Sequence, residues 1–302
     1  MKKWLNAFRL RTLPLALSTV IMGAGTAYIF QPSTFKQSVL WLTIVTTIFL
    51  QVLSNLANDY GDAQKGADNE GRIGPKRTIQ AGLITKKAML RAMIVCVILA
   101  LGSGVLLLFQ AFEIINWLFL LWLVIGIGAI GAAIAYTVGK TAYGYKGLGD
   151  VFVFLFFGIV GVYGTFFLFN HEPFFPILLP ATTIGCLSAA VLNLNNMRDH
   201  ENDAKVGKNT IVVKMGLAKA KIYHYLLFIL AYLSLSAYQI LAGINFIGWI
   251  IIGLFLIIHL LHLVQIKRIT EPAKFDPFLK IIALSTFGLS LLYSLRLVYN
   301  AY

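Results

Sequence analysis

Charged residues are scarce in this sequence of 302 residues. Asp, Glu, Lys and Arg together make up only 12% of the chain, about half the share of roughly 25% that is usual in soluble domains. Hydrophobic residues account for 59%, and the mean hydropathy is +0.80. Because so few polar side chains could not cover a water-soluble surface, the composition excludes a soluble globular domain and predicts an integral membrane protein.

Cysteine and acidic residues are also few. The two cysteines, Cys96 and Cys186, fall within apolar runs, which excludes a disulfide framework and predicts that both pack as small hydrophobic residues. The 12 acidic residues stand against 25 Lys and Arg, a net charge of +13. In a soluble protein this excess would indicate nucleic acid. Here the basic residues lie between apolar runs, so they indicate membrane topology and no nucleic-acid partner.

Nine apolar runs are each long enough to cross a bilayer as a helix, which takes about 20 residues. They cover roughly residues 12–30, 38–58, 89–110, 116–137, 150–169, 174–197, 220–241, 245–266 and 278–298. None shows the period-two alternation of a barrel strand, and backbone groups in lipid must be paired within each segment. We therefore expect an all-α, polytopic bundle of nine transmembrane helices that forms one domain over residues 1–302.

The basic residues also predict the orientation of the bundle. Twenty-three of the 25 Lys and Arg residues fall in the N-terminal tail and in the connections after runs 2, 4, 6 and 8, and only Lys36 and Arg296 fall on the other side. The positive-inside rule places the basic side in the cytoplasm. We expect a multi-pass membrane protein, surrounded by membrane lipids, with its N-terminus in the cytoplasm and its C-terminus outside.

Two polar segments end the second and sixth apolar runs, both on the predicted cytoplasmic side. The first reads Asn55-Leu-Ala-Asn58-Asp59-Tyr-Gly-Asp62, and the second reads Asn195-Asn-Met-Arg-Asp199-His-Glu-Asn-Asp203. Spacings of three and four residues place the Asn and Asp side chains of each segment on one helix face. The shared form, Asn-x-x-x-Asp followed by a second Asp, hints at an internal duplication.

Carboxylates at the end of a helix need a cation. They face the negative end of the helix dipole and repel one another. Oxygen ligands without Cys or His suit Mg²⁺, which binds through one or two carboxylates together with substrate phosphates. The two segments therefore predict Mg²⁺ ions that hold a diphosphate between two helix ends.

Basic residues near these segments are candidates for binding phosphate oxygens. They are Arg72, Lys76 and Arg77 after the second run, Lys140 and Lys146 after the fourth, and Arg198 inside the second segment. For each, the alternative is a role in topology alone. Tyr136 belongs either to an interfacial aromatic belt or to a pocket, and Asp150 is either the N-cap of the fifth run or a site residue. Asp68, Glu70 and Glu201 lie off the shared faces and are expected to be solvated loop residues.

Five separated stretches carry a family resemblance. They are Arg9-Leu-Arg-Thr-Leu-Pro14, Ser54-Asn-Leu-Ala-Asn-Asp-Tyr-Gly-Asp62, Gly74-Pro-Lys-Arg-Thr78, Tyr143-Gly-Tyr-Lys-Gly-Leu-Gly-Asp150, and Asn195-Asn-Met-Arg-Asp199 through Gly207-Lys-Asn-Thr210. The chain resembles the UbiA superfamily of intramembrane prenyltransferases, which has nine helices and Asp-rich motifs after helices 2 and 6. Within it, the chain is most similar to the 1,4-dihydroxy-2-naphthoate polyprenyltransferases.

The resemblance implies an activity and a role for each site residue. Transfer of a polyprenyl group from polyprenyl diphosphate to the aromatic acceptor 1,4-dihydroxy-2-naphthoate, with loss of CO₂, would give demethylmenaquinone. Asn55, Asp59, Asp62, Asp199 and Asp203 would hold Mg²⁺, supported by Asn195. Lys140 would lie near the diphosphate, Arg11 or Arg9 would meet the acceptor carboxylate, and Tyr136 would stabilise an allylic cation through its ring.

Three alternatives stay open on the sequence alone. A secondary transporter would also show repeats and polar residues in its helices, although transporter ion sites tend to lie near the midplane. An alcohol phosphotransferase of phospholipid synthesis would carry Asp-Gly-x-x-Ala-Arg, which neither Asp segment contains. A superfamily member with another aromatic or lipid acceptor would share the same metal site.

Overall fold

The computed structural model describes residues 2–243 and 246–299, and within these ranges it contains helices and no strand. The helices are α1 (Lys2–Phe8), α2 (Leu13–Phe30), α3 (Gln37–Gln64), α4 (Lys86–Phe112), α5 (Trp117–Ala135), α6 (Gly149–Val153), a π-helical segment (Phe154–Tyr163), α7 (Gly164–Asn170), α8 (Leu178–Lys205), α9 (Ile211–Leu241), α10 (Phe246–Arg268) and α11 (Asp276–Tyr299). Short 3-10 turns at Leu10–Thr12, Pro32–Thr34, Tyr143–Lys146, Phe175–Ile177 and Pro272–Phe275 join some of them. The predicted all-α class is confirmed.

Nine stretches of the described chain are long and apolar enough to cross a membrane, as the sequence predicted. The first joins α1 and α2, and the fifth joins α6, the π-helical segment and α7. Both Asp-rich helices continue beyond their apolar parts. The second run was predicted to end at residue 58 and the sixth at 197, whereas α3 ends at Gln64 and α8 at Lys205.

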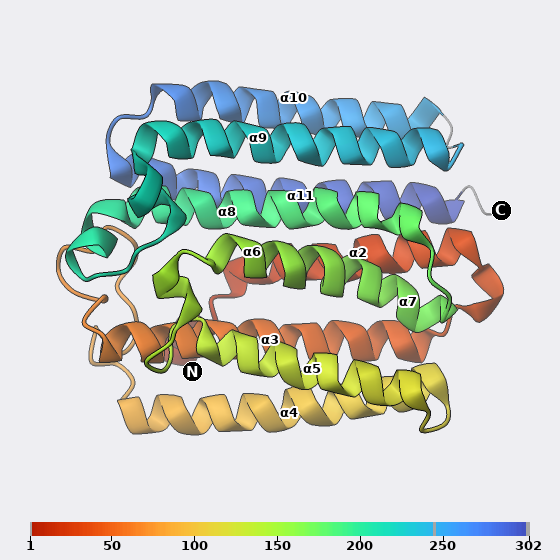
Figure 1. Ribbon diagram of the computed structural model, residues 1–302, viewed down its shortest axis with the longest axis horizontal. Coiled ribbons are helices and arrows are strands. Elements are labelled where there is room, and N and C mark those ends of the chain that lie inside the picture. Colours follow the sequence, from red (N-terminus) through yellow and green to blue (C-terminus); the bar gives the residue numbers. More distant parts are fainter. Residues whose placement is uncertain (1, 244–245, 300–302) are drawn as a thin grey trace.

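The helices lie side by side along the long axis of the molecule (Figure 1). α2 packs against α11 from the opposite end of the chain, and α8 packs between α9 and the π-helical segment. α3 and α4 form the opposite side of the bundle together with α5, whose only buried residue is Phe119. Large apolar side chains such as Trp117, Leu233 and Phe246 are exposed on the outer faces. A surface of this kind is stable in lipid, so the chain is a multi-pass membrane protein.

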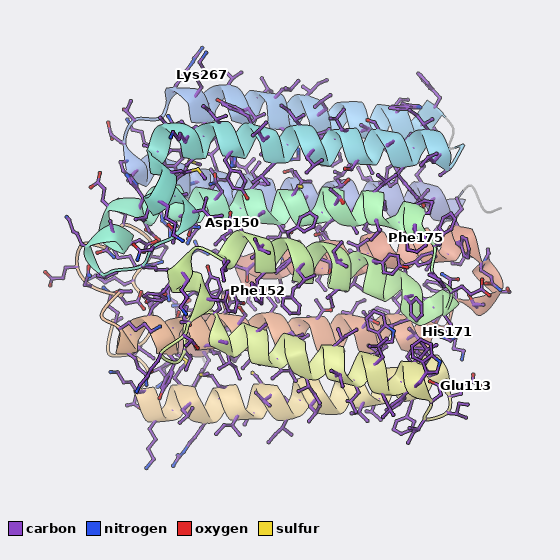
Figure 2. All side chains as sticks on the ribbon, in the orientation of Figure 1. Glu113, Asp150, Phe152, His171, Phe175 and Lys267 are labelled. Carbon is purple, nitrogen blue, oxygen red and sulfur yellow. The ribbon has the colours of Figure 1, made fainter. Side chains whose placement is uncertain are left out.

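The connections alternate between two ends of the bundle (Figure 1). Those that follow α3, α5, α8 and α10 lie at the left in the figure, and those that follow α2, α4 and α7 lie at the right. Glu113 and His171 lie at the right-hand end (Figure 2), and Lys36 reaches Glu113 there with an Nζ–Oε1 distance of 2.5 Å. The predicted alternation of the loops is therefore present in the fold.

The two Asp-rich helices end in the same way. In α3, the N–H of Ala67 donates to the carbonyl of Asp62 (3.0 Å) across Gly66, whose φ is 70°. In α8, the N–H of Lys208 donates to the carbonyl of Asp203 (2.8 Å) across Gly207, whose φ is 73°. This is the Schellman ending, in which a glycine adopts the left-handed conformation that other residues avoid. Each helix thus stops two residues after its last aspartate.

Candidate active site

Five aspartates lie buried at the end of the bundle where α3 and α8 terminate. Asp59 and Asp62 come from α3, and Asp199 and Asp203 come from α8, each with 5% of its surface exposed or less. The fifth is Asp68, in the connection between α3 and α4, whose side chain is 1% exposed. Buried carboxylates are costly unless paired, so their partners decide how the site is built.

Arg77 lies at the centre of the carboxylates on the α3 side. Its Nη1 is 2.6 Å from Asp62 and 2.7 Å from the carbonyl oxygen of Asn58, and its Nε is 3.1 Å from Asp68. Burial alone would lower the pKa of Arg77, but the charges of Asp62 and Asp68 outweigh burial and raise the pKa above its usual value. Arg77 therefore stays charged and holds the loop against the end of α3.

Arg72 and Lys208 join the two Asp-rich helices. Arg72 lies 3.6 Å from Asp68 and 3.8 Å from Asp199, and burial lowers its pKa to about 10. The ammonium of Lys208 lies 3.9 Å from Asp62 and 3.8 Å from Asp203, so it contacts the last aspartate of each helix. These two residues bring the halves of the predicted site together.

The N-terminal segment closes the site from another side. Arg9 has left-handed backbone angles (φ 50°, ψ 58°) between α1 and the following turn, and its guanidinium forms an ion pair with Asp59. Thr78 donates to the other oxygen of Asp59 (3.1 Å). Asn55 donates from Nδ2 to the carbonyl of Phe8 and to Thr12 Oγ1, both at 2.9 Å. Asn55 thus anchors the segment that positions Arg9.

Arg198 is buried and its donors are taken by protein groups. Its Nε and Nη2 bind both oxygens of Asp199 (3.0 and 2.6 Å), Nη2 also donates to Asn195 Oδ1 (2.7 Å), and Nη1 binds Asp276 at the start of α11. Only 1% of the residue is exposed. The structure thus places this candidate phosphate ligand, with Asn195, in a framework that fixes Asp199.

Four other candidate cations lie at the surface. Arg11, Lys76, Lys140 and Lys146 are all exposed, and within the described chain none of their side chains makes an ion pair with the five aspartates. Lys146 contributes its backbone carbonyl, which accepts from Lys214 Nζ at 2.6 Å. The geometry therefore brings Arg72 and Arg77 into the cluster and leaves these four at its periphery.

The carboxylate cluster suits divalent ions that are shared with a substrate. Within residues 2–243 and 246–299, no three acidic, His or Cys side chains are close enough to hold one ion by themselves. Mg²⁺, however, is usually held by one or two carboxylates, with phosphate and water completing its shell. A buried oxygen of Asp203, Oδ2, has no hydrogen-bond partner in the described structure. Such an oxygen in an all-oxygen donor set fits Mg²⁺.

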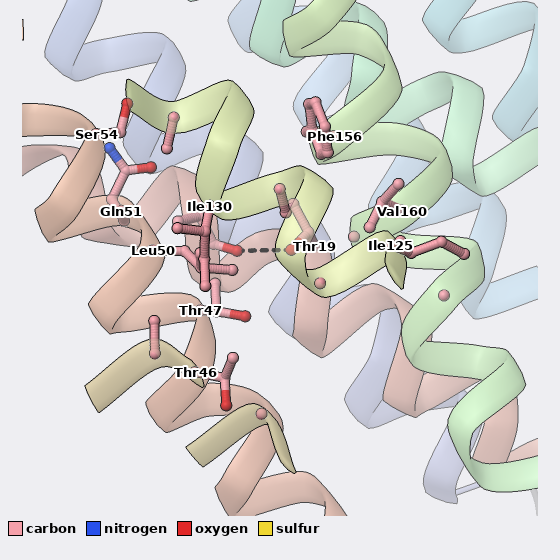
Figure 3. Close-up of a pocket in the computed structure, with 18 of the residues that line it drawn as sticks. Thr19, Thr46, Thr47, Leu50, Gln51, Ser54, Ile125, Ile130, Phe156 and Val160 are labelled. Atoms are coloured by element: carbon pink, nitrogen blue, oxygen red, sulfur yellow. Dashed lines mark hydrogen bonds between the residues drawn. The ribbon is translucent and has the colours of Figure 1, made fainter. Parts of the chain in front are cut away.

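A cavity of about 360 Å³ begins beside this cluster and runs along the bundle. Asn55, Asn58, Tyr136, Tyr143 and Leu192 line it near the aspartates, and Leu108 and Leu168 line it farther along the bundle. Ile125, Ile130, Phe156 and Val160 border the cavity in Figure 3. The Tyr136 hydroxyl makes no hydrogen bond to the described residues, and burial followed by the charge of Asp150 raises its pKa, so it stays protonated. Tyr136 therefore lines a pocket, as one of its two predicted roles required.

Comparison with known proteins shows the same architecture and similar sequences. The model of the UbiA prenyltransferase family matches residues 16–291. The chain belongs to the UbiA prenyltransferase family. A 1,4-dihydroxy-2-naphthoate octaprenyltransferase of Haemophilus influenzae is 42% identical over 99% of this chain and 96% of its own, and one of Escherichia coli is 43% identical over 82% and 79%. The chain is thus a UbiA prenyltransferase.

A solved structure supports the fold of this UbiA protein. A UbiA homolog from Archaeoglobus fulgidus, determined with bound GPP and Mg²⁺, superimposes with a TM-score of 0.64 over 98% of this chain and 99% of its own. Its sequence identity of 17% is low, so this likeness establishes the shared fold alone. The predicted bundle architecture is confirmed.

One expectation from the sequence was wrong. Asp68 was expected to be a solvated loop residue, but the loop folds back and buries it against Arg72 and Arg77. Of the two interpretations of Asp150, the N-cap is contradicted, because Leu148 is the N-cap of α6 and Asp150 lies buried in the first turn. Glu70 and Glu201 are exposed, as expected. Cys96 and Cys186 are buried free thiols, also as expected.

Lys208 is the main residue of the UbiA site that sequence reasoning missed. It lies five residues after Asp203, beyond the helical face that the spacing identified. The available signal was the glycine before it, because a Gly just beyond a helix predicts a left-handed turn. That turn directs Lys208 back toward both aspartates.

Proposed function

We propose that this UbiA prenyltransferase transfers a polyprenyl group from polyprenyl diphosphate to 1,4-dihydroxy-2-naphthoate, with release of diphosphate and CO₂. The observation that carries the proposal is the convergence of two Asp-rich helix ends at the mouth of a mainly apolar cavity. The names of relatives at 42% and 43% identity support the choice of acceptor.

Mg²⁺ is the proposed cofactor, held by Asp59 and Asp62 on one helix and by Asp199 and Asp203 on the other. When bound, Mg²⁺ would neutralise the charge that develops on the leaving diphosphate. Lys208 and Arg72 lie between the helices and would bind phosphate oxygens directly. Arg77 and Arg198 would hold the carboxylates in place, as their contacts with Asp62 and Asp199 indicate.

The cavity supplies what an allylic cation requires. The diphosphate departs with the electron pair of its carbon–oxygen bond and leaves a positive charge spread over the prenyl carbons. Tyr136 and Tyr143 line the cavity near the aspartates, and their ring faces would stabilise this charge. The apolar walls formed by Phe156 and Val160 would exclude water that would otherwise capture the cation.

The acceptor completes the reaction without an oxidant. The ring carbon that carries the carboxylate attacks the prenyl cation, and a carbon–carbon bond forms. The bond to the carboxylate then breaks, CO₂ leaves, and its electron pair restores the aromatic ring. Because no electrons are removed, the product is the quinol form of demethylmenaquinone.

The proposed location is the bacterial inner membrane with the aspartates at the cytoplasmic face. The basic connections lie at the same end of the bundle as the aspartates, which is the cytoplasmic side under the positive-inside rule. A water-soluble acceptor would enter from that side, and the prenyl chain would extend along the cavity.

Product analysis of the purified protein tests the proposal. The protein is incubated with polyprenyl diphosphate, Mg²⁺ and a panel of aromatic acceptors, and products are identified by mass spectrometry. We expect prenylated naphthoquinol and CO₂ from 1,4-dihydroxy-2-naphthoate and no product with EDTA. Asp59→Ala and Asp199→Ala should insert into the membrane but lack activity. A product formed only from another acceptor would contradict the assigned substrate, and activity in both variants would contradict the metal assignment.

A further inference from the structure

One wall of the cavity carries polar side chains that the transfer reaction described above does not use. Thr47, Gln51 and Ser54 lie on α3 at spacings of four and three residues, which places them on one helix face. Figure 3 shows them one after another along this helix, with Leu50 among them. The apolar side chains of Ile125, Phe156 and Val160 come from the π-helical segment and α5.

The polar atoms of this wall have hydrogen-bonding capacity to spare. Gln51 donates from Nε2 to Thr12 Oγ1 at 3.2 Å and to Asn55 Oδ1 at 3.5 Å. Its carbonyl oxygen and the hydroxyls of Ser54 and Thr47 make no hydrogen bond to any part of the chain that the structure describes. None of these atoms is sealed from the cavity. They are available to a molecule inside it.

Other hydroxyls on the same helix have partners. Thr43 donates to the carbonyl of Val39 at 2.7 Å, and Thr46 donates to Ser103 Oγ at 2.9 Å. These are the usual ways in which Ser and Thr are accommodated in a transmembrane helix. The unused capacity is therefore concentrated on the part of α3 that approaches the aspartates.

The segment of α3 that carries Gln51 and Ser54 lies at the distance from the aspartates where the two substrates must meet. At a rise of 1.5 Å per residue, Ser54 lies about 7.5 Å and Gln51 about 12 Å along the helix axis from Asp59. The first prenyl carbon is attached to the diphosphate, so the acceptor ring must lie just beyond the carboxylates. Ser54 and Gln51 therefore flank the expected position of the ring.

Aromatic rings line the cavity at the same end. Tyr143 stacks on Phe152 with centroids 4.0 Å apart and an interplanar angle of 21°, and Tyr136 meets Tyr143 edge to face at 5.3 Å. A prenyl chain has no atom that can satisfy Gln51 or Ser54, and leaving them unpaired beside it would be unfavourable. A planar ring with hydroxyl groups would stack on the aromatic side chains and form hydrogen bonds with the polar face of α3.

We propose that Gln51 and Ser54 recognise the two ring hydroxyls of the aromatic acceptor, while the prenyl chain follows the apolar wall formed by α5 and the π-helical segment. This assignment rests on the proposed function. The Gln51 carbonyl oxygen accepts a hydrogen bond from one hydroxyl, which increases the electron density of the ring that attacks. Ser54 pairs with the other hydroxyl. These two residues of α3 then select an acceptor whose ring carries two hydroxyl groups.

Steady-state kinetics with each substrate varied in turn test the assignment. Gln51→Leu and Ser54→Ala should each raise KM for the acceptor by about tenfold, the effect of one lost hydrogen bond. KM for polyprenyl diphosphate and the affinity for Mn²⁺, measured by electron paramagnetic resonance as a probe of the metal site, should stay unchanged. Ser54→Thr keeps the hydroxyl and should retain the wild-type KM. Ser18→Ala is the matched control, because Ser18 bonds the Leu15 carbonyl outside the cavity (2.6 Å).

A second acceptor that lacks one ring hydroxyl distinguishes recognition from a general structural effect. The wild type should discriminate against this monohydroxy analogue. One of the two variants should have lost most of that discrimination, because it lacks the side chain that pairs with the missing hydroxyl. Two results would overturn this assignment and leave the proposed function intact. One is an equal rise in KM for the acceptor and for polyprenyl diphosphate. The other is that both variants still discriminate fully against the monohydroxy analogue. A wild type that prenylates no hydroxylated aromatic ring would overturn the proposed function and this assignment with it.

Discussion

Arg77 forms ion pairs with three of the five aspartates of the site. Its guanidinium lies within 3.8 Å of Asp59, Asp62 and Asp68, and 9% of the residue is exposed. A planar group with donors on several edges can serve three acceptors at once, which a lysine ammonium on a flexible stem cannot do with the same geometry. Together with Thr78, which donates to Asp59, Arg77 therefore fixes the loop between α3 and α4 to the end of α3.

Removing Arg77 should destabilise the protein strongly. We expect Arg77→Ala to lower the free energy of unfolding by about 3–5 kcal/mol, because buried carboxylates lose their partner. Arg77→Lys should recover only part of this loss. Thermal unfolding in detergent measures both. Lys76→Ala, which removes a neighbouring exposed cation, should change the unfolding temperature little, and a similar loss in that control would contradict the central role of Arg77.

Asp68 predicts a pH dependence of stability in the absence of Mg²⁺. Burial raises its pKa to about 6, more than the opposing charge of Arg77 lowers it. Between the unfolded value of about 3.9 and 6, the folded protein holds a proton that the unfolded chain has lost. The contribution of Asp68 to stability therefore falls as the pH rises through this window. Asp68→Asn should remove that part of the pH dependence in thermal unfolding curves, and an unchanged profile would contradict the shift.

Helical spacing predicted the four aspartates of the site, and the loop cations Arg72 and Arg77 were predicted as candidates from their charge and their place near the Asp segments. Asp59, Asp62, Asp199 and Asp203 share helix faces, and the structure brings them together around Lys208 and Arg72. Asp68 and Lys208 lie beyond the ends of the helices, where no periodicity fixes a side chain. Their places depend on the path of a loop that long-range ion pairs select.

At the scale of elements, α3 is held unusually close to the end of α5. A Cβ at Gly61 would lie 2.6 Å from the carbonyl carbon and from Oγ1 of Thr137. Thr137 in turn donates to the carbonyl of Ala57 at 2.8 Å. Because Gly61 stands between Asp59 and Asp62, this contact sets where the two carboxylates lie.

Gly61→Ala should therefore impair the enzyme by moving α3. We expect a loss of prenyl transfer of at least about tenfold, together with lower thermal stability, since an overpacked contact typically costs 1–3 kcal/mol. Gly102→Ala is the control, because it lies in α4 with open space around it and should be neutral or slightly stabilising. Full activity of Gly61→Ala in a membrane assay would contradict the close contact.

Hydropathy predicted which segments form helices but not where the helices end. Apolar length is sufficient to identify a spanning helix, and all nine runs are helical in the described chain. α3 and α8 extend six and eight residues past the predicted ends, because the polar turns that follow are stabilised by ion pairs and close at Gly66 and Gly207. The π-helical segment, Phe154–Tyr163, lies inside an apolar run whose hydropathy does not distinguish it from an α-helix.

At the scale of the whole molecule, the distribution of charge predicts an orientation that can be measured. Single cysteines at Glu70 and Glu113 report on the two ends, because both positions are exposed and the native cysteines are buried. In intact cells, a membrane-impermeant maleimide should label Glu113→Cys directly and Glu70→Cys only after permeabilisation. The reverse pattern would place the aspartates outside and contradict the proposed location.

The five aspartates of the site face five cations, namely Arg9, Arg72, Arg77, Arg198 and Lys208. Such an assembly is already close to electroneutral. A metal ion alone would make it positive and a diphosphate alone would make it negative, and either excess is unfavourable in a buried setting. The two ligands together cancel one another. Each should therefore tighten the binding of the other by the same factor, so that the enzyme takes up its metal with its substrate and releases both together.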